Sequence, residues 1–170
     1  LTRLLFEQAP PGLVLTTVNA ALVTAAMGFV AEPLAVWTWF ASLLLILAAR
    51  ALLLRRFRRD RAAAADAAWT RRFTLGAAAT GIAWGLATLL LPGRDLSYQV
   101  FLGFVLSGMV AGAIPTLSHH LLAYRAYLLT ALLPFGVHLA ILDNQLAYTF
   151  LFMLILFGFF MWINAGRYHE

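Results

Sequence analysis

The chain has 170 residues, of which 63% are hydrophobic and only 11% are charged, and its formal net charge is +5. Soluble domains carry roughly 45–50% apolar and about 25% charged residues, so this composition excludes an ordinary soluble domain and indicates a polytopic membrane protein. The absence of cysteine excludes disulfides, thiolate catalysis and cysteine-based metal sites.

Six apolar stretches predict six spanning helices, since each crossing takes roughly 20 residues. After a short lead-in, which we expect Pro10 and Pro11 to break from the first span, the predicted spans are 12–30, 34–54, 73–91, 98–117, 121–142 and 146–163. Pro115 is expected to bend the end of the fourth span. The predicted fold is therefore all-α, a single six-helix transmembrane bundle covering residues 1–170.

An arginine-rich connection at 55–72 sets the predicted topology. Basic residues beside spans stay cytoplasmic, so this connection and both chain ends are expected inside. Alanine favours helix, and we expect the connection to be helical. Arg50, just before the cluster, is expected to turn its charge toward the inner surface. The basic positions are Arg55, Arg56, Arg58, Arg59, Arg61, Arg71 and Arg72. A topology signal that also contacts anionic lipid explains this charge better than a nucleic-acid-binding face.

Two G-x-x-x-G pairs predict close helix packing, because glycine lets two backbones approach. Gly81 and Gly85 lie in the third span, and Gly108 and Gly112 lie in the fourth. Packing within one protomer is the favoured interpretation, and a dimer seam is the alternative.

Candidate ligand-binding residues lie in the fifth span, where Pro134 predicts a kink by freeing the carbonyl of Thr130. His138 follows one turn later, and an ionisable group within a span is costly and often functional. Asn19 in the first span and Trp84 in the third complete the candidate set. We expect an apolar or lipid-like ligand beside the bend.

The histidines do not predict a metal or haem site. His119 and His120 are adjacent and do not face the same way on a helix. At 1.5 Å per residue, His138 is roughly 27 Å further along the fifth span than His120. No cofactor is therefore predicted. No Ser-His-Asp set, H-E-x-x-H or phosphate-binding glycine loop is present, and we expect no catalytic residue in this chain.

Residues 71–167 resemble a known bacterial module. The stretches that carry the resemblance are Arg71-Arg72-Phe73, the run from Gly81 to Gly85, the run from Phe101 to Ala113, and Leu132-Leu-Pro134. They are similar to the multi-span N-terminal sensor region of bacterial signalling proteins.

That resemblance implies a homodimeric protein of the bacterial inner membrane. Its last span would continue into a cytoplasmic helix that feeds a histidine kinase of a two-component system, or a GGDEF or EAL domain of cyclic-di-GMP signalling. A small transporter or channel is the alternative, although no convincing inverted repeat is visible. A haem-binding redox protein is less favoured.

Overall fold

The computed structural model describes residues 2–59, 67–91, 96–117 and 120–167, and the side chains of these residues except 2–9, 67 and 96. The helices are α1 (Thr2–Met27), α2 (Pro33–Arg59), α3 (Ala67–Leu90), α4 (Leu96–Gly112), α5 (Ile114–Leu117), α6 (Leu121–Ile141) and α7 (Gln145–Arg167). Six helical segments, with α4 and α5 counted together, are long and apolar enough to cross a membrane. The prediction of six apolar helices is thus confirmed.

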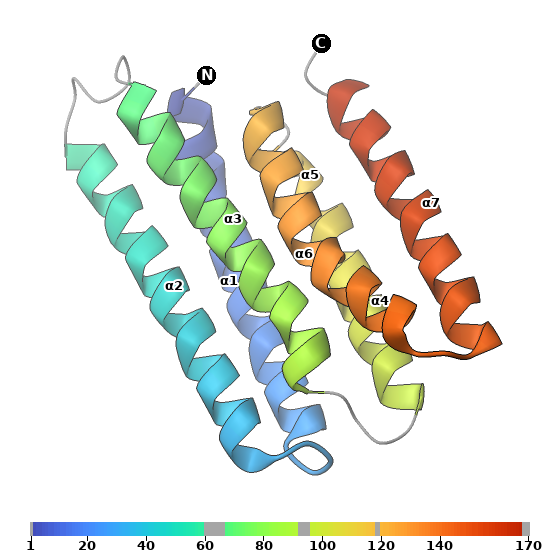
Figure 1. The fold of residues 1–170 in the computed structure, drawn as a ribbon. Helices are drawn as coiled ribbons and strands as arrows, with labels where there is room; N and C mark the ends of the chain where they lie inside the picture. Colours follow the sequence, from blue (N-terminus) through green and yellow to red (C-terminus); the bar gives the residue numbers. More distant parts are fainter. Residues whose placement is uncertain (1, 60–66, 92–95, 118–119, 168–170) are drawn as a thin grey trace.

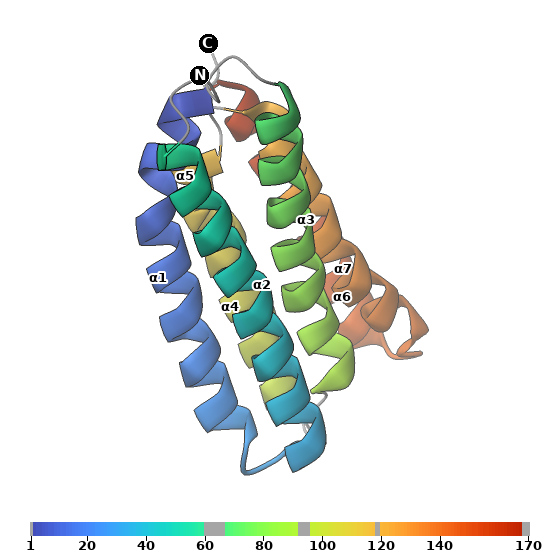
Figure 2. The ribbon, with the colours of Figure 1, turned by 90° about the vertical axis from the view of Figure 1, so that its left-hand side faces the viewer.

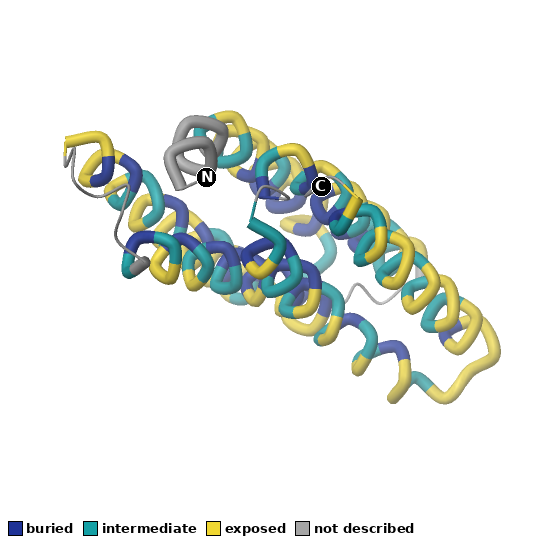
Figure 3. Tube along the Cα trace, turned by 90° about the horizontal axis from the view of Figure 1, so that it is seen from above, coloured by how far each residue is buried: buried dark blue, intermediate teal, exposed yellow. Residues whose placement is uncertain are grey.

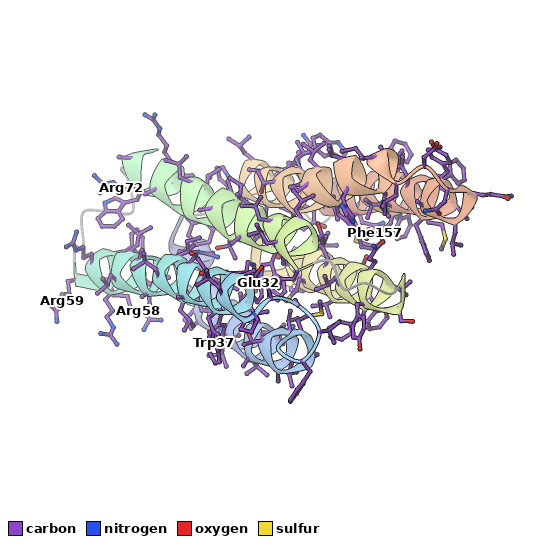
Figure 4. The ribbon with its side chains drawn as sticks, turned by 60° about the horizontal axis from the view of Figure 1, so that its bottom comes forward. Glu32, Trp37, Arg58, Arg59, Arg72 and Phe157 are labelled. Carbon is purple, nitrogen blue, oxygen red and sulfur yellow. The ribbon has the colours of Figure 1, made fainter. Side chains whose placement is uncertain are left out.

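The long helices run side by side, with α1 and α2 on one side of the molecule, α6 and α7 on the other, and α3 between them (Figure 1). Figure 2 shows α4 behind α1 and α2. The N-terminal ends of α1 and α3 and the C-terminal ends of α2 and α7 lie at one end of the bundle, which we call the basic end (Figures 1 and 4). Its described arginines include those of the predicted topology signal, Arg55, Arg56, Arg58, Arg59, Arg71 and Arg72, together with Arg125 and Arg167. Arg61 lies outside the described residues.

The outer surface of the bundle is apolar along its length. Phe29, Leu45 and Phe104 are 94%, 73% and 78% exposed, and exposed segments line the outside of the helices in Figure 3. Apolar patches of this extent are unusual on soluble monomers. The surface therefore suits contact with lipid chains, as a multi-pass membrane protein requires.

The adjacent prolines of α1 do not break this helix, contrary to the prediction. Helix α1 runs through Pro10 and Pro11 without a break, so the predicted separation of a lead-in from the first span is wrong. A proline removes only its own N–H from the ladder, and spanning helices tolerate this loss. Pro134 is likewise inside α6. The fourth span does break, at Ala113 between α4 and α5, two residues before Pro115.

The core is built around α3, which packs against α2 and α6. The rings of Trp39 and Trp84 meet edge to face with centroids 5.4 Å apart. Trp39 Nε1 donates a hydrogen bond to the carbonyl oxygen of Ala83 over 2.7 Å. Buried threonines such as Thr24 and Thr88 donate to carbonyls of their own helix, which satisfies their hydroxyls without a partner helix. The interior is therefore closely packed on the α2–α3–α6 side.

Candidate functional site

A groove between α4, α6 and α7 is the main apolar cavity beside the candidate segment of α6. We call it the α4–α6–α7 groove. Its volume is about 290 Å³. It is lined by Gln99, Val100, Gly103, Phe104, Ser107, Phe135, Leu139, Phe150, Met153, Leu154 and Phe157.

Small residues on α4 and large ones on α6 and α7 make this space. Gly103 and Ser107 are one turn apart on α4, and the missing side chain at Gly103 lets the ring of Phe135 approach α4 closely. The nearest ring atom of Phe135 would be 2.8 Å from a Cβ added at Gly103. A groove with these walls suits an acyl chain or another slender apolar molecule.

Gln99 and Ser107 are the polar residues that line the groove. Gln99 Oε1 is buried and has no hydrogen-bond partner among the described residues. A buried amide oxygen without a partner carries a desolvation cost of about 1–3 kcal/mol.

The four ligand candidates named from the sequence contact other parts of the bundle. Asn19 Nδ2 lies 3.0 Å from Met109 Sδ, between α1 and α4. Trp84 is 2% exposed and packs on Trp39. Pro134 faces α3, since its Cγ would be 2.7 Å from a Cβ on Gly85. None of the candidates lines the α4–α6–α7 groove.

Pro134 and His138 lie on the same turns of α6 as two residues that line the groove, but on a neighbouring face of the helix. Phe135 and Leu139 line the groove and are four residues apart on one face. Pro134 and His138 form the neighbouring row. His138 Nε2 is buried without a hydrogen-bond partner among the described residues, outside the groove. A sequence signal for the groove was available: Phe135 and Leu139 are four residues apart on the fifth span, and the small residues Gly103 and Ser107 are four residues apart on the fourth.

The predicted glycine packing is found between α3 and α6. A Cβ at Gly81 would overlap Thr130 Oγ1 and lie 2.6 Å from the Tyr127 carbonyl oxygen. A Cβ at Gly85 would lie 2.8 Å from the carbonyl oxygens of Thr130 and Ala131. The α3 backbone thus covers the Thr130 carbonyl, which Pro134 deprives of its amide partner.

The second glycine pair has open surroundings. A Cβ at Gly108 meets nothing within 4 Å, and one at Gly112 meets only Leu15 Cδ2, at 3.9 Å. The two pairs therefore do not form one seam between α3 and α4. Gly81 and Gly85 alone permit a close backbone approach in the described structure.

At the basic end, α7 is held to α6 by a cation–π contact. The guanidinium carbon of Arg125 lies 4.2 Å from the centroid of the Trp162 ring. Arg125 Nε is buried with no hydrogen-bond partner among the described residues. Elsewhere α7 packs on α6 through Leu151 and Leu154, which face Gly136 at 3.7 Å from its Cβ position.

Arg50 does not turn toward the basic end, so the predicted snorkelling is wrong. Its Nη1 donates to Thr80 Oγ1 over 3.0 Å, inside the bundle. Its guanidinium carbon lies 5.7 Å from the Phe73 ring centroid. Helical side chains lean toward the N-terminus of their helix, and the N-terminus of α2 is at the opposite end.

Metal ligands are not gathered in the part of the chain that the structure describes: no group of three or more His, Asp or Glu side chains there is arranged to hold an ion. His120 instead caps α6, with Nδ1 accepting from the Ala123 amide over 3.2 Å. His119 lies outside the described residues.

Comparisons with protein-family models, with curated proteins and with solved structures find no match to this chain. The resemblance to bacterial sensor regions therefore stays a prediction, and the functional argument has to start from the geometry above.

Proposed function

We propose that this chain is a membrane-embedded sensory input domain of a bacterial signalling protein. An apolar or lipid-like ligand occupies the α4–α6–α7 groove, and α7 passes the resulting change to a cytoplasmic histidine kinase or cyclic-di-GMP output. The observation that carries the proposal is that the groove has one wall on the loosely packed α7 and another on α6, which is locked to α3.

A ligand shifts a conformational equilibrium only by its differential affinity for the two states. A molecule in the groove contacts Phe135 and Leu139 on α6 and Met153 and Phe157 on α7. Its binding energy therefore depends on where α7 sits relative to α6. Figure 4 labels Phe157 on the α7 side of the molecule. Movement of α7 is the smallest change that couples the groove to the basic end.

The proposal requires the basic end to face the cytoplasm. Eight arginines with described side chains lie there, including Arg125 and Arg167, whereas the described acidic side chains, those of Glu32 and Asp143, are exposed in the turns at the opposite end. This asymmetry favours retention of the basic end inside the cell. Reporters fused after Arg59 and after Leu91 should report opposite sides of the membrane. Reports from the same side would contradict this topology.

Groove occupancy is tested with a photoactivatable fatty acid and a matched pair of substitutions. Ser107→Phe fills the groove, whereas Gly108→Phe places the same ring at a neighbouring position, where an added Cβ meets no other atom within 4 Å. Labelling of α4 and α7 peptides should fall several-fold in Ser107→Phe and stay unchanged in Gly108→Phe. Equal labelling of both variants would remove the groove as the site.

Transmission through α7 is tested in a chimaera that continues the helix from Gly166 into a dimeric kinase. Inserting one to four residues after Gly166 rotates the output by about 100° per residue. Kinase activity should rise and fall with insertion length, because transmission by rotation or shift depends on helix phase. A flat response would mean that α7 serves only as an anchor.

A further inference from the structure

A second cavity lies in the basic half of the bundle and contains the charge of Arg50. We call it the Arg50 cavity. Its volume is about 40 Å³, and residues of α1, α2, α3, α4, α5 and α6 line it. One water molecule needs roughly 10–15 Å³ of cavity volume, so the cavity can hold a few waters or one small ion. Arg50, Thr80 and Tyr127 are among its polar lining residues.

The arginine is directed into this space by the packing around its stem. A Cβ on Gly76 would lie 3.1 Å from Arg50 Cγ, so the absence of a side chain at Gly76 makes room for the stem. The guanidinium then reaches Thr80, one turn further from the basic end than Gly76. It therefore points toward the middle of the bundle, away from the arginine cluster.

The positive charge in the cavity is not balanced by a described carboxylate. Among the side chains that the structure describes, the acidic ones are Glu32 and Asp143, both exposed at the opposite end. A buried charge without a counter-charge is strongly destabilising, and charges within spans are normally paired. A second charge of opposite sign is thus expected near Arg50.

The threonine hydroxyl groups around the cavity do not neutralise the charge on Arg50. Thr80 donates its proton to the Gly76 carbonyl and accepts from Arg50. Thr16 and Thr116 donate to the carbonyls of Gly12 and Ala113. A guanidinium has five N–H donors, and the bond to Thr80 uses one of them. The remaining donors are suited to a halide or a carboxylate.

We propose that the Arg50 cavity binds a small monoanion, either a halide or a carboxylate group, against the Arg50 guanidinium. The carboxylate has two possible sources, a small soluble acid or the head of a fatty acid in the membrane. The site is separate from the α4–α6–α7 groove, and it does not depend on the proposed sensory function.

The test measures the thermal unfolding midpoint, Tm, of the purified full chain in detergent at constant ionic strength. Chloride, formate, laurate and sulfate are titrated separately against gluconate. At a tenfold excess over Kd, chloride or formate should raise Tm by about 3–6 °C. Sulfate should give no Arg50-dependent rise, because it is larger and doubly charged. A rise with laurate but not with formate assigns the carboxylate to the membrane.

Three variants decide the outcome. Arg50→Gln should lose the anion-dependent rise, whereas Arg58→Gln, an exposed arginine on the same helix, should keep it. Gly112→Leu keeps Arg50 but fills the cavity, and its Cβ meets only an ordinary contact with Leu15. It should also lose the rise. It provides the decisive comparison if Arg50→Gln does not fold. No anion effect in the wild type, or an equal effect in Gly112→Leu, overturns the proposal.

Discussion

Helices α3 and α7 have similar length and apolar character but different attachment to the bundle. In the segments of these helices that are long and apolar enough to cross a membrane, 50% of the α3 residues are buried, against 6% of the α7 residues. Mean hydropathy runs the other way, at 1.5 for α3 and 2.2 for α7. In this bundle, greater hydropathy therefore does not mean greater burial.

The reason is that lipid chains are as apolar as the protein interior. Burying leucine or phenylalanine between spanning helices gains little hydrophobic free energy, so close packing and hydrogen bonds decide which helices associate. Helix α3 presents Gly81 and Gly85 to α6 and Gly76 to the stem of Arg50. Helix α7 presents large side chains, and Phe152, Phe159 and Phe160 are 61%, 64% and 60% exposed.

The difference in packing indicates that α3 stays fixed against α6 and that α7 can move. The α3–α6 pair is close-packed, and shifting it would break backbone-to-backbone contacts. Helix α7 has few buried residues, and such elements move at low free-energy cost. Three predictions test this difference between α3 and α7, in order of decreasing expected effect.

The largest effect is expected for Gly85→Ala. The added methyl group would lie 2.7–2.8 Å from Pro134 Cγ and from two backbone carbonyl oxygens of α6, so the helices must separate. We expect a loss of about 3 kcal/mol, at the upper end of overpacking costs. Reversible unfolding in mixed detergent measures it.

Gly108→Ala is the matched control, because a Cβ there meets nothing within 4 Å. It should be neutral or stabilising by up to about 1 kcal/mol from helix propensity. Equal losses for Gly85→Ala and Gly108→Ala would show that the α3–α6 contact is not the tight one. Gly103 is not a neutral control, since Phe135 lies close to its Cβ position.

The sequence was sufficient to predict those features of the fold that depend on the residues of one helix alone. Six apolar segments and the break near Pro115 follow from local composition, and the structure has both. Residues 55–59 continue α2 as helix, as predicted for the first part of the arginine-rich connection.

What the sequence could not supply is which helices become neighbours. Gly81-x-x-x-Gly85 and Gly108-x-x-x-Gly112 look alike in the sequence, yet only the first pair meets a partner backbone. That distinction depends on the rotation of α4 in the bundle. The inward direction of Arg50, by contrast, could have been predicted. Helical side chains lean toward the N-terminus of their helix, which opposes snorkelling at the C-terminal end of α2.

A smaller effect is expected at the contact between Arg125 and Trp162. Trp162→Leu removes the ring that lies 4.2 Å from the guanidinium, and a desolvated cation–π pair contributes about 2 kcal/mol. The basic end of α7 should then separate more widely from α6. Because the chain has no cysteine, spin labels at Leu122→Cys and Ile163→Cys report this distance directly.

Phe160→Leu is the control for the spin-label measurement, since Phe160 is 60% exposed and makes no described ring contact with Arg125. The label distance distribution should broaden and lengthen in Trp162→Leu and stay as in the parent in Phe160→Leu. An unchanged distribution in Trp162→Leu would mean that other contacts hold the basic end of α7.

The smallest effect, and the sharpest comparison with Gly85→Ala, is expected for Gly158→Ala on α7. A Cβ at Gly158 would lie 3.2 Å from Leu132 Cδ1, the flexible end of a side chain, and Leu132 can rotate away at little cost. The gain in helix propensity, about 1 kcal/mol, opposes that cost. The net change in unfolding free energy should therefore stay within about 1 kcal/mol of zero. The same Gly-to-Ala change is thus costly where α6 meets α3 and nearly neutral where α6 meets α7. A loss at Gly158 as large as the loss at Gly85 would mean that α7 is as tightly packed as α3, and α7 would then no longer be the helix that moves most easily.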